Sequence, residues 1–368
     1  MPFELYACGF NAHGQLAGAS SEEPPQDLSC VQFMLRANHI RILFAGWADT
    51  LLEIDGRLLL RGASTNGQDE ILQCDISSPT WRTAFGDHNG VRGLVTEEDD
   101  VYLVETAYAG PPTLRKIKSG TQNVSIAGNG KVCEAVGAKS SAQCHILEYP
   151  TFAAFSDPLT NSTLRHTLPL TPTALISNET SFTALFHSSP TTPSAVYTWG
   201  DPRHTSLGRL PSASQPAASP HPIDHLGGIN LRKVCSGGWI SAALSDSDDL
   251  YIWGGRAGEE HRIQALPDVG SGEVTLVDLQ GDDGGMVDVV DVAVGAGHVL
   301  LLDGDGSVWG AGRNENGQLD RGAGRQRFLE DWTRLDLNFD QKDKTGAKRK
   351  VEGVHCGAWN SFVLVSLC

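Results

Sequence analysis

The chain has 368 residues, of which 40% are hydrophobic, and its formal net charge is −16 with an isoelectric point near 5.1. This charge argues against an overall electrostatic surface for nucleic acid or anionic membrane, because both are polyanions. No apolar run is long enough to span a bilayer, and Met1–Leu16 lacks the charged and apolar regions of a signal peptide. We therefore expect an intracellular protein of the nucleus, the cytoplasm or both, and not a secreted one.

Glycine and cysteine usage narrows the class of structure further. The 41 glycines follow no collagen-like period, which indicates many tight turns between short strands. The eight cysteines are scattered, and none forms a C-x-x-C pair or lies at zinc-finger spacing from a histidine. We expect free thiols in a reducing compartment.

The segment Tyr6–Leu16 reads as a strand end followed by a glycine-punctuated turn that closes on Gly-Gln-Leu. The same arrangement returns near the other end of the chain in Val308–Leu319. Less complete copies are Tyr197–Gly208 and Tyr251–Gly254. A pattern repeated at irregular intervals, with a copy near each end, predicts a closed array of similar units.

After a polar connector at Ala19–Leu28, the segment Ile40–Leu60 shows a unit in full. Two of its apolar runs are joined by Asp55-Gly56, a pair that accepts the positive φ required by a two-residue hairpin turn. A corner of small residues and one aromatic residue, Gly46-Trp47, precedes this hairpin. The unit is therefore strand, corner, strand, turn and strand.

Parts of this unit recur along the rest of the chain. The further copies lie at Phe85–Val104, Asn123–Val136, Ser181–Trp199 with a Pro-rich turn at Ser188–Ser194, Gly237–Trp253, Gly295–Trp309 and Cys356–Val365. The last copy lacks its second hairpin strand and its Gly-Gln-Leu turn, and the N-terminal segment supplies both. We therefore predict a ring of seven small sheets, in which borrowed N-terminal strands hide an open edge.

The corner pattern C-G-x-W/H and the turn pattern W-G-x-G-x-x-x-x-G-Q-L resemble the regulator-of-chromosome-condensation repeat. Val292–Leu319 is the best match, and residues 85–190 match only in outline. The resemblance implies an all-β fold, a single seven-bladed β-propeller. The expected blades are residues 40–80, 81–118, 119–170, 171–226, 227–285 and 286–340, with 350–368 plus 1–18 as the last. The corners are most similar to those of the small domain-containing members of the family.

The repeated side chains have two interpretations. Trp199, Trp253 and Trp309 are expected to wedge between sheets, and Gln15 and Gln318 to hydrogen-bond turn backbone. Five corner residues stand where blades turn toward the central shaft, and these are Trp47, His88, Trp239, His298 and Trp359. They either build the ring or form a protein-binding mouth on one face, since aromatic residues are favoured interface anchors. Among them Trp239 and Trp359 follow small residues, which leaves their rings little shielded.

The sequence carries no G-x-S-x-G motif, P-loop or H-E-x-x-H motif. Asp303–Gly306 is similar to a calcium loop, but it lacks the later glutamate and stands where a hairpin turn is due. We therefore expect no catalytic residues, no cofactor and no metal site. Three loops are further candidates for function: Pro202–Leu226, the acidic Asp278–Asp291, and Lys342–Lys350. The last is either a solvated loop or a weak nuclear-import or phosphate-contacting patch.

These observations favour a non-catalytic scaffold or regulatory propeller that is monomeric and binds protein, with no direct contact to nucleic acid or membrane. The resemblance to the small family members implies a chromatin-associated JmjC-type oxygenase as the partner. One alternative is guanine-nucleotide exchange on a Ran-like small GTPase, the activity of the founding member, whose basic tail is missing here. A second alternative is an enzyme-inhibiting propeller that caps an active site.

Overall fold

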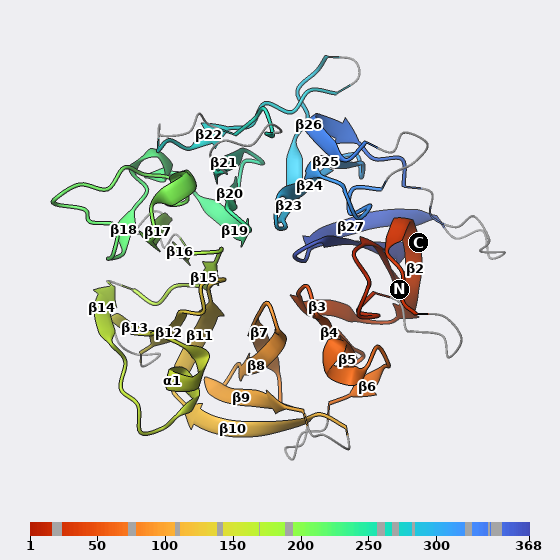
Figure 1. Cartoon of the computed structure of the whole chain (residues 1–368). Coiled ribbons are helices and arrows are strands. Elements are labelled where there is room, and N and C mark those ends of the chain that lie inside the picture. The colour runs from red at the N-terminus through yellow and green to blue at the C-terminus, as the bar shows by residue number, and fades with distance from the viewer. Residues whose placement is uncertain are drawn as a thin grey trace.

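The computed structural model describes residues 1–16, 24–72, 79–106, 111–137, 143–168, 170–187, 194–255, 262–266, 272–281, 284–320, 326–337, 339 and 348–368. In these residues seven four-stranded antiparallel sheets stand around a central axis (Figure 1). The predicted seven-bladed β-propeller is confirmed. Six of the sheets are meanders, because strands adjacent in the chain also pair with each other.

The first six blades follow one another along the chain. Blade 1 contains β3 (Ile40–Ala45), β4 (Asp49–Ile54), β5 (Arg57–Gly62) and β6 (Glu70–Ile71), and blade 2 contains β7 (Trp81–Asp87), β8 (Gly90–Thr96), β9 (Asp100–Glu105) and β10 (Thr113–Ser119). Blade 3 contains β11 (Thr121–Ile126), β12 (Val132–Val136), β13 (Cys144–Tyr149) and β14 (Leu164–Leu168), and blade 4 contains β15 (Ala174–Ser177), β16 (Ser181–Phe186), β17 (Ala195–Gly200) and β18 (His221–Pro222). Blade 5 contains β19 (Leu231–Gly237), β20 (Ile240–Ser245), β21 (Leu250–Gly254) and β22 (Thr275–Leu276), and blade 6 contains β23 (Val289–Val294), β24 (His298–Asp303), β25 (Val308–Arg313) and β26 (Phe328–Arg334).

Blade 7 joins the two ends of the chain. Its strand order is β2 (Leu28–Ala37), β1 (Phe3–Gly9), β28 (Asn360–Leu367) and β27 (Arg349–Cys356), so that the N-terminal strands complete the C-terminal sheet. The sequence prediction placed residues 1–18 in this blade. The structure adds β2, the outermost strand of this blade, in which only Leu28 is buried.

Helices are few among the described residues. The α-helix α1 (Phe152–Ser156) lies in blade 3, and the 3₁₀ turns are η1 (Ala63–Thr65), η2 (Arg203–Thr205) and η3 (Asp224–Leu226). None of these described helices is long and apolar enough to cross a membrane. The predicted Pro-rich turn at Ser188–Ser194 lies outside the described residues except for Ser194.

The core consists of apolar layers between neighbouring blades. Trp199 is buried among residues of blades 3 and 4, and its ring stacks on Phe182 at 5.6 Å between centroids. Trp253 is buried between blades 4 and 5, and Trp309 between blades 5 and 6. The prediction that these tryptophans wedge between sheets is confirmed. Because each blade covers its neighbour, the ring buries both faces of each sheet.

Candidate functional site

The corner turns between the first and second strands of the blades surround one mouth of the central shaft, and consecutive corners touch. The Glu179 amide donates to the Gly238 carbonyl at 2.9 Å, which links blades 4 and 5, and the Ala296 amide donates to the Ala358 carbonyl at 2.8 Å, which links blades 6 and 7. At Gly237 a Cβ would lie 2.6 Å from a carbonyl oxygen of the blade 6 corner. Only glycine allows this approach, so the small corner residues hold the mouth rigid.

The Gly-Gln-Leu turns lie beside these corners and repeat one hydrogen-bond scheme. The Asn11 side-chain oxygen accepts from the Leu16 amide at 2.8 Å, and the Asn314 oxygen accepts from the Leu319 amide at 2.9 Å. Both turns therefore depend on an asparagine five residues before the leucine. Short polar side chains of this kind replace a backbone acceptor within the turn.

The motif glutamines hydrogen-bond turn backbone, as the sequence predicted. The Gln15 amide donates to the carbonyl of Trp47 at 3.0 Å, and its oxygen accepts from the His13 amide at 3.1 Å. The Gln318 oxygen accepts from the Asn316 amide at 3.0 Å. Gln15 thus ties the turn of blade 7 to the corner of blade 1.

A glycine with positive φ marks the end of the third strand in five blades, and the residue after it projects beside a corner. Gly9, Gly62, Gly200 and Gly254 are the last residues of their strands, and Gly312 stands one residue before the end of β25. The next amide then bonds back to the corner of the same blade: Phe10 donates to Trp359, and Arg313 donates to Gly297, each at 2.8 Å. Phe10 and Arg313 occupy equivalent positions. Both stand on the face of the propeller that carries the corner turns, which we call the corner face.

Four aromatic rings gather on this face at the junction of blades 7 and 1. Trp47 and Trp359 each keep 37% of their surface exposed, and their ring centroids are 5.9 Å apart. Phe10 lies 5.5 Å from Trp359, and His13 lies 5.7 Å from Trp47. We call Phe10, His13, Trp47 and Trp359 the aromatic cluster. Aromatic contacts of this kind contribute about 0.5–1.5 kcal/mol each beyond burial, so the rings are held in place before any partner arrives.

Trp239 stands on the corner of blade 5 and contacts a different ring. The His204 imidazole lies 4.3 Å from it between centroids. His204 and Thr205 have φ of 61° and 55°, a left-handed conformation that is an outlier for a β-branched residue. Such strain persists only where surrounding structure imposes it, and here it places the imidazole against Trp239.

His88 and Glu179 meet across the mouth of the shaft. The Nε2 atom of His88 lies 3.4 Å from a carboxylate oxygen of Glu179, and both groups lie over Gly128 of the intervening blade. The imidazole is exposed, so His88 is on the corner face, and its described contact there is the polar one with Glu179. The His88–Glu179 pair bridges blades 2 and 4.

His298 does not belong to the exposed face that the sequence analysis assigned to it. Its side chain is fully buried between blades 6 and 7, with Nε2 3.0 Å from the Ser361 hydroxyl oxygen and the ring packed over Gly295. Burial lowers the pKa of the imidazole from 6.5 to about 4. The ring is neutral near pH 7, and no partner can reach it in this conformation.

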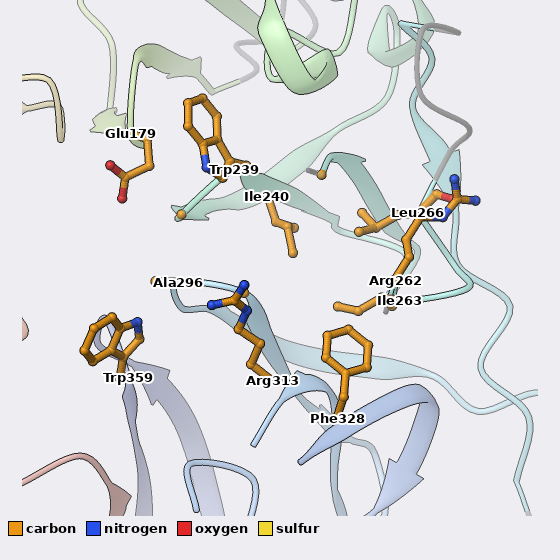
Figure 2. Close-up of a pocket in the computed structure, with 13 residues that line it drawn as sticks. Glu179, Trp239, Ile240, Arg262, Ile263, Leu266, Ala296, Arg313, Phe328 and Trp359 are labelled. Carbon is orange, nitrogen blue, oxygen red and sulfur yellow. The ribbon is translucent and has the colours of Figure 1, made fainter. Parts of the chain in front are cut away.

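Two cavities open on the corner face. The shaft has a volume of about 550 Å³ and is lined by the first strands and corners of all seven blades, including Trp47 and Trp359. A smaller pocket of about 170 Å³ lies between blades 5 and 6, with Trp239, Trp359 and Arg313 among its lining residues (Figure 2). Trp359 therefore connects the aromatic cluster to this second pocket.

In the described parts of the three candidate loops, most of the charged side chains contact other residues of the chain. The Arg349 guanidinium lies 2.9 Å from the buried Glu4 carboxylate, and Lys350 lies 3.1 Å from Glu352. Lys342 and Lys344 of the same loop, and Asp282 and Asp283 of the acidic loop, lie outside the described residues. In the Pro202–Leu226 loop the buried Arg209 donates to several backbone carbonyls, which fixes the loop against β17.

The possible calcium loop is a hairpin turn. The Asp303 carboxylate accepts from the Asp305 and Ser307 amides at 3.0 and 2.7 Å and from the Trp309 indole at 2.8 Å. Among the described residues, no group of three or more His, Cys, Asp or Glu side chains is arranged to hold a metal ion.

Sequence reasoning missed Phe10, His13 and Arg313 as residues of the candidate face. These side chains occupy variable positions within the turns, while the pattern marks only the glycine, glutamine and leucine around them. The available signal was positional. Phe10 and Arg313 each follow a glycine with positive φ near the end of a third strand, and such a residue stands beside a corner.

Comparison with known proteins agrees with this geometry. Residues 289–318 match the family described as the regulator of chromosome condensation (RCC1) repeat. RCC1 domain-containing protein 1 of Mus musculus is 26% identical over 202 residues, which cover 46% of this chain and 50% of that protein. The E3 ubiquitin-protein ligase HERC2 of Homo sapiens is 31% identical over 176 residues, which cover 46% of this chain but 3% of the ligase. The matches thus span half or less of these relatives.

Among solved structures, Prp20p from Saccharomyces cerevisiae has the same fold. Its TM-score is 0.69 at 13% identity, and the alignment covers 100% of this chain and 92% of Prp20p. That protein was studied for its binding to Gsp1p and histones. The likeness to Prp20p at this identity establishes the fold.

Proposed function

We propose that this chain, an RCC1-like seven-bladed propeller, is a non-catalytic regulatory module that binds a protein partner through its corner face. The aromatic cluster carries the proposal, because Trp47 and Trp359 are both exposed and in mutual contact beside the mouth of the shaft. Tryptophans dominate the binding energy of many interfaces. The rigid ring of corners also lowers the entropy lost when a partner binds, since the site is already ordered.

A chromatin-associated JmjC-type oxygenase is the partner class we favour. Its support is the similarity of the corners to the small domain-containing members of the family, together with the match to RCC1 domain-containing protein 1. A Ran-like small GTPase is the alternative, and the shared fold with Prp20p, which was studied with Gsp1p, favours it. An active-site-capping inhibitor is a third class, which the same capture experiment would reveal as a bound enzyme.

Affinity capture from nuclear and cytoplasmic extracts, followed by mass spectrometry, tests the proposed face. Trp47→Ala and Trp359→Ala should each reduce recovery of the partner, by about thirtyfold in affinity if each anchor contributes 2 kcal/mol. Trp332→Ala is the control for loss of a tryptophan elsewhere, because this residue lies in the outermost strand β26 and packs, partly buried, against the core of blades 5 and 6. Recovery of the same proteins by the wild type and by both cluster variants, with all melting temperatures intact, would contradict the proposal.

The identity of the captured protein separates the partner classes. Where a GTPase is recovered, release of a fluorescent guanine nucleotide from it would be measured with and without the chain. Faster nucleotide release in the presence of the chain would show exchange activity and would contradict a purely scaffolding function. Where an oxygenase is recovered, its turnover in the presence of the chain distinguishes a regulator from an inhibitor.

A further inference from the structure

The outer strands of the blades differ in how they protect their free edge. β6, β18 and β22 have two residues each, and β10, β14 and β26 each carry two or three Arg, Lys, His, Asp or Glu side chains. Short strands and charged side chains are the usual means of keeping an edge from pairing with another strand. β2 has ten residues and one such side chain, Arg36, next to its last residue. Among these strands β2 is therefore the least protected.

The outer side of β2 lies at the rim of blade 7 (Figure 1). In the part of the chain that the structure describes, β2 pairs with β1 alone. Its start is covered by the Gly-Gln-Leu turn of blade 6, because a Cβ at Gly317 would lie 2.6 Å from the Ser29 Cα. In an antiparallel pair, alternate residues direct their backbone groups away from the partner strand. The outer side of Cys30–Leu35 therefore offers a row of backbone donors and acceptors.

Phe33 adds an apolar contact to this edge. Its side chain is 47% exposed, and its ring lies 5.8 Å from the Tyr6 ring between centroids. Tyr6 belongs to the buried core between blades 6 and 7, and the partly buried Val31 packs against the same core. Phe33 thus extends this core to the rim, where aromatic residues pair favourably with an apolar neighbour on a further strand.

Two irregularities in β2 determine which kind of strand fits its outer side. The pairing with β1 shifts register once between Leu28 and Gln32 and once between Phe33 and Leu35. Such bulges bend and twist a strand. Two identical rigid edges bent in this way do not lie straight along each other, whereas a flexible peptide segment follows the bend. The geometry therefore favours an extended segment over a second copy of the propeller.

β2 begins beside the aromatic cluster. Asn11, which lies between Phe10 and His13 in the sequence, donates from its backbone amide to the Asp27 carboxylate at 3.0 Å. Its side chain donates to the Gln26 carbonyl at 3.1 Å. Because residues 26 and 27 immediately precede β2, a partner held by the aromatic cluster is able to continue along the rim beside this strand.

We propose that β2 accepts an extended segment of the protein partner as a fifth strand of blade 7. Backbone hydrogen bonds to the outer side of the strand supply the affinity, and an apolar residue of the segment packs beside Phe33. The alternate residues of the segment, on the side of Gln32, are polar and uncharged, because the run Ser29–Phe33 holds no charge with which to pair. This inference rests on the proposed function, since the segment belongs to the partner that the corner face binds.

Hydrogen exchange shows where such a segment binds. A phage-displayed library of random peptides would be panned against the full chain, and amide exchange of the chain would be measured with and without the synthesised, enriched peptides. We expect peptides that alternate apolar and uncharged polar residues and that slow exchange within residues 30–35. No enrichment, enrichment of charged peptides, or protection confined to other strands would overturn the inference. Protection of residues 30–35 that appears without peptide as the chain is concentrated would assign the edge to a second copy and would also overturn it.

Methylation of the peptide backbone separates strand pairing from binding through side chains alone. Each N–H of the peptide would be replaced in turn by N–CH₃, and affinity would be measured by fluorescence anisotropy. Only every second N–H of a paired strand faces β2, so affinity should fall about two- to tenfold at alternate positions, the range for loss of one backbone hydrogen bond. It should stay unchanged at the positions between them. Equal effects at successive positions would contradict pairing with β2.

A variant of the chain tests the apolar contact. Phe33→Ala should weaken peptide binding about two- to fivefold, the range for loss of a cross-strand side-chain pair. Leu164→Ala is the matched control, because Leu164 is also 47% exposed and lies in the outer strand β14. Unchanged affinity in Phe33→Ala, or an equal loss in Leu164→Ala, would overturn the placement of the segment. The methylation series leaves the chain unaltered, so it decides the question even where Phe33→Ala fails to fold.

The two proposals can fail separately. The Trp47 and Trp359 variants in the capture experiment report on the corner face, while exchange and backbone methylation report on β2. Capture that depends on both tryptophans, without protection of β2 by any peptide, would leave the proposed function intact and remove this inference. Protection of β2 with alternating methylation effects, together with capture that ignores both tryptophans, would keep the edge as a binding site and remove the corner face from the proposed function.

Discussion

His298 illustrates how burial decides the chemistry of a single residue. The side chain lies between blades 6 and 7 with its pKa lowered from 6.5 to about 4 by burial, so the folded protein holds it neutral. The unfolded chain protonates the same residue near pH 6.5. Its contribution to stability is therefore complete above pH 6.5 and is lost as the pH falls from 6.5 toward 4.

This pKa shift predicts a measurable loss of stability in mild acid. Between pH 7 and pH 5 the His298 imidazole should account for about 2 kcal/mol of lost unfolding free energy, from 1.36 kcal/mol per pKa unit. In His298→Gln, which keeps a polar group near Ser361, the decrease between these pH values should shrink by that amount. Urea denaturation at both pH values measures it. Equal decreases in wild type and variant would show that the histidine is not held neutral.

Residue positions on the corner face were predictable only in part. Trp47 and Trp359 follow small residues in a repeated corner, and the pattern therefore pointed to them. Phe10 and Arg313 share one position of the repeat but differ in chemistry, so no residue type marks that position. His298 lies one residue beyond the corner position of Trp239 and Trp359, because it is the first residue of β24 and pairs with Gly312 as Ile240 pairs with Gly254 and Asn360 with Gly9. Its burial follows from this place in the strand, which the spacing of the sequence pattern did not separate from the corner.

At the scale of elements, arginines near the start of two first strands link their blades to the next. Arg82 of β7 donates to Asp99 in its own blade at 2.7 Å and to the Gln122 carbonyl of β11 at 2.9 Å. Arg232 of β19 repeats the arrangement, with Asp248 at 2.5 Å and the Val290 carbonyl of β23 at 3.2 Å. These side chains connect sheets that otherwise meet through apolar layers.

Removal of such a link should destabilise the ring more than removal of an exposed ion pair. Arg82→Met leaves the nearly buried Asp99 and the Gln122 carbonyl without this donor and should reduce the free energy of unfolding by about 1.5–3 kcal/mol. Arg115→Met is the control, because its pair with Glu105 is exposed on β10 and should contribute about 0.2–1 kcal/mol. Urea denaturation compares the two, and equal losses would assign no special role to the inter-blade link.

The elements themselves were predictable to the extent that burial shapes their sequence. Inner strands such as β20 and β24 are buried along their whole length and read as apolar runs. The outermost strands β6, β18 and β22 have two residues each, too few to form a pattern. β2 has ten residues, of which only Leu28 is buried, and beyond the predicted connector Ala19–Leu28 the sequence analysis assigned this stretch to no unit.

At the scale of the whole molecule, closure depends on one sheet built from both ends of the chain. β1 pairs with β28 along its length, from Phe3 opposite Ser366 to Gly9 opposite Asn360. The buried Glu4 carboxylate lies 2.5 Å from Arg36 of β2 and 2.9 Å from Arg349 of β27. It therefore joins the two edge strands of the sheet. Burial alone would raise the pKa of Glu4, but hydrogen bonds from Arg349, Arg36 and Tyr6 hold it below its ordinary value.

Closure of this kind can be tested by supplying the missing half-blade as a separate peptide. A chain of residues 39–368 lacks β1 and β2, which leaves the edge of β28 unpaired, and exposed edges of this type promote aggregation. We expect this truncated chain to melt at a lower temperature and to self-associate in light scattering. Addition of a peptide of residues 1–38 should restore a monomer with the melting temperature of the intact protein, because the peptide replaces the same backbone pairing and the same Glu4 contacts. A peptide carrying Glu4→Ala should restore less, since Arg36 and Arg349 would each lose their contact with the buried Glu4 carboxylate. A truncated chain that stays monomeric with an unchanged melting temperature would show that the ring does not need its N-terminal strands.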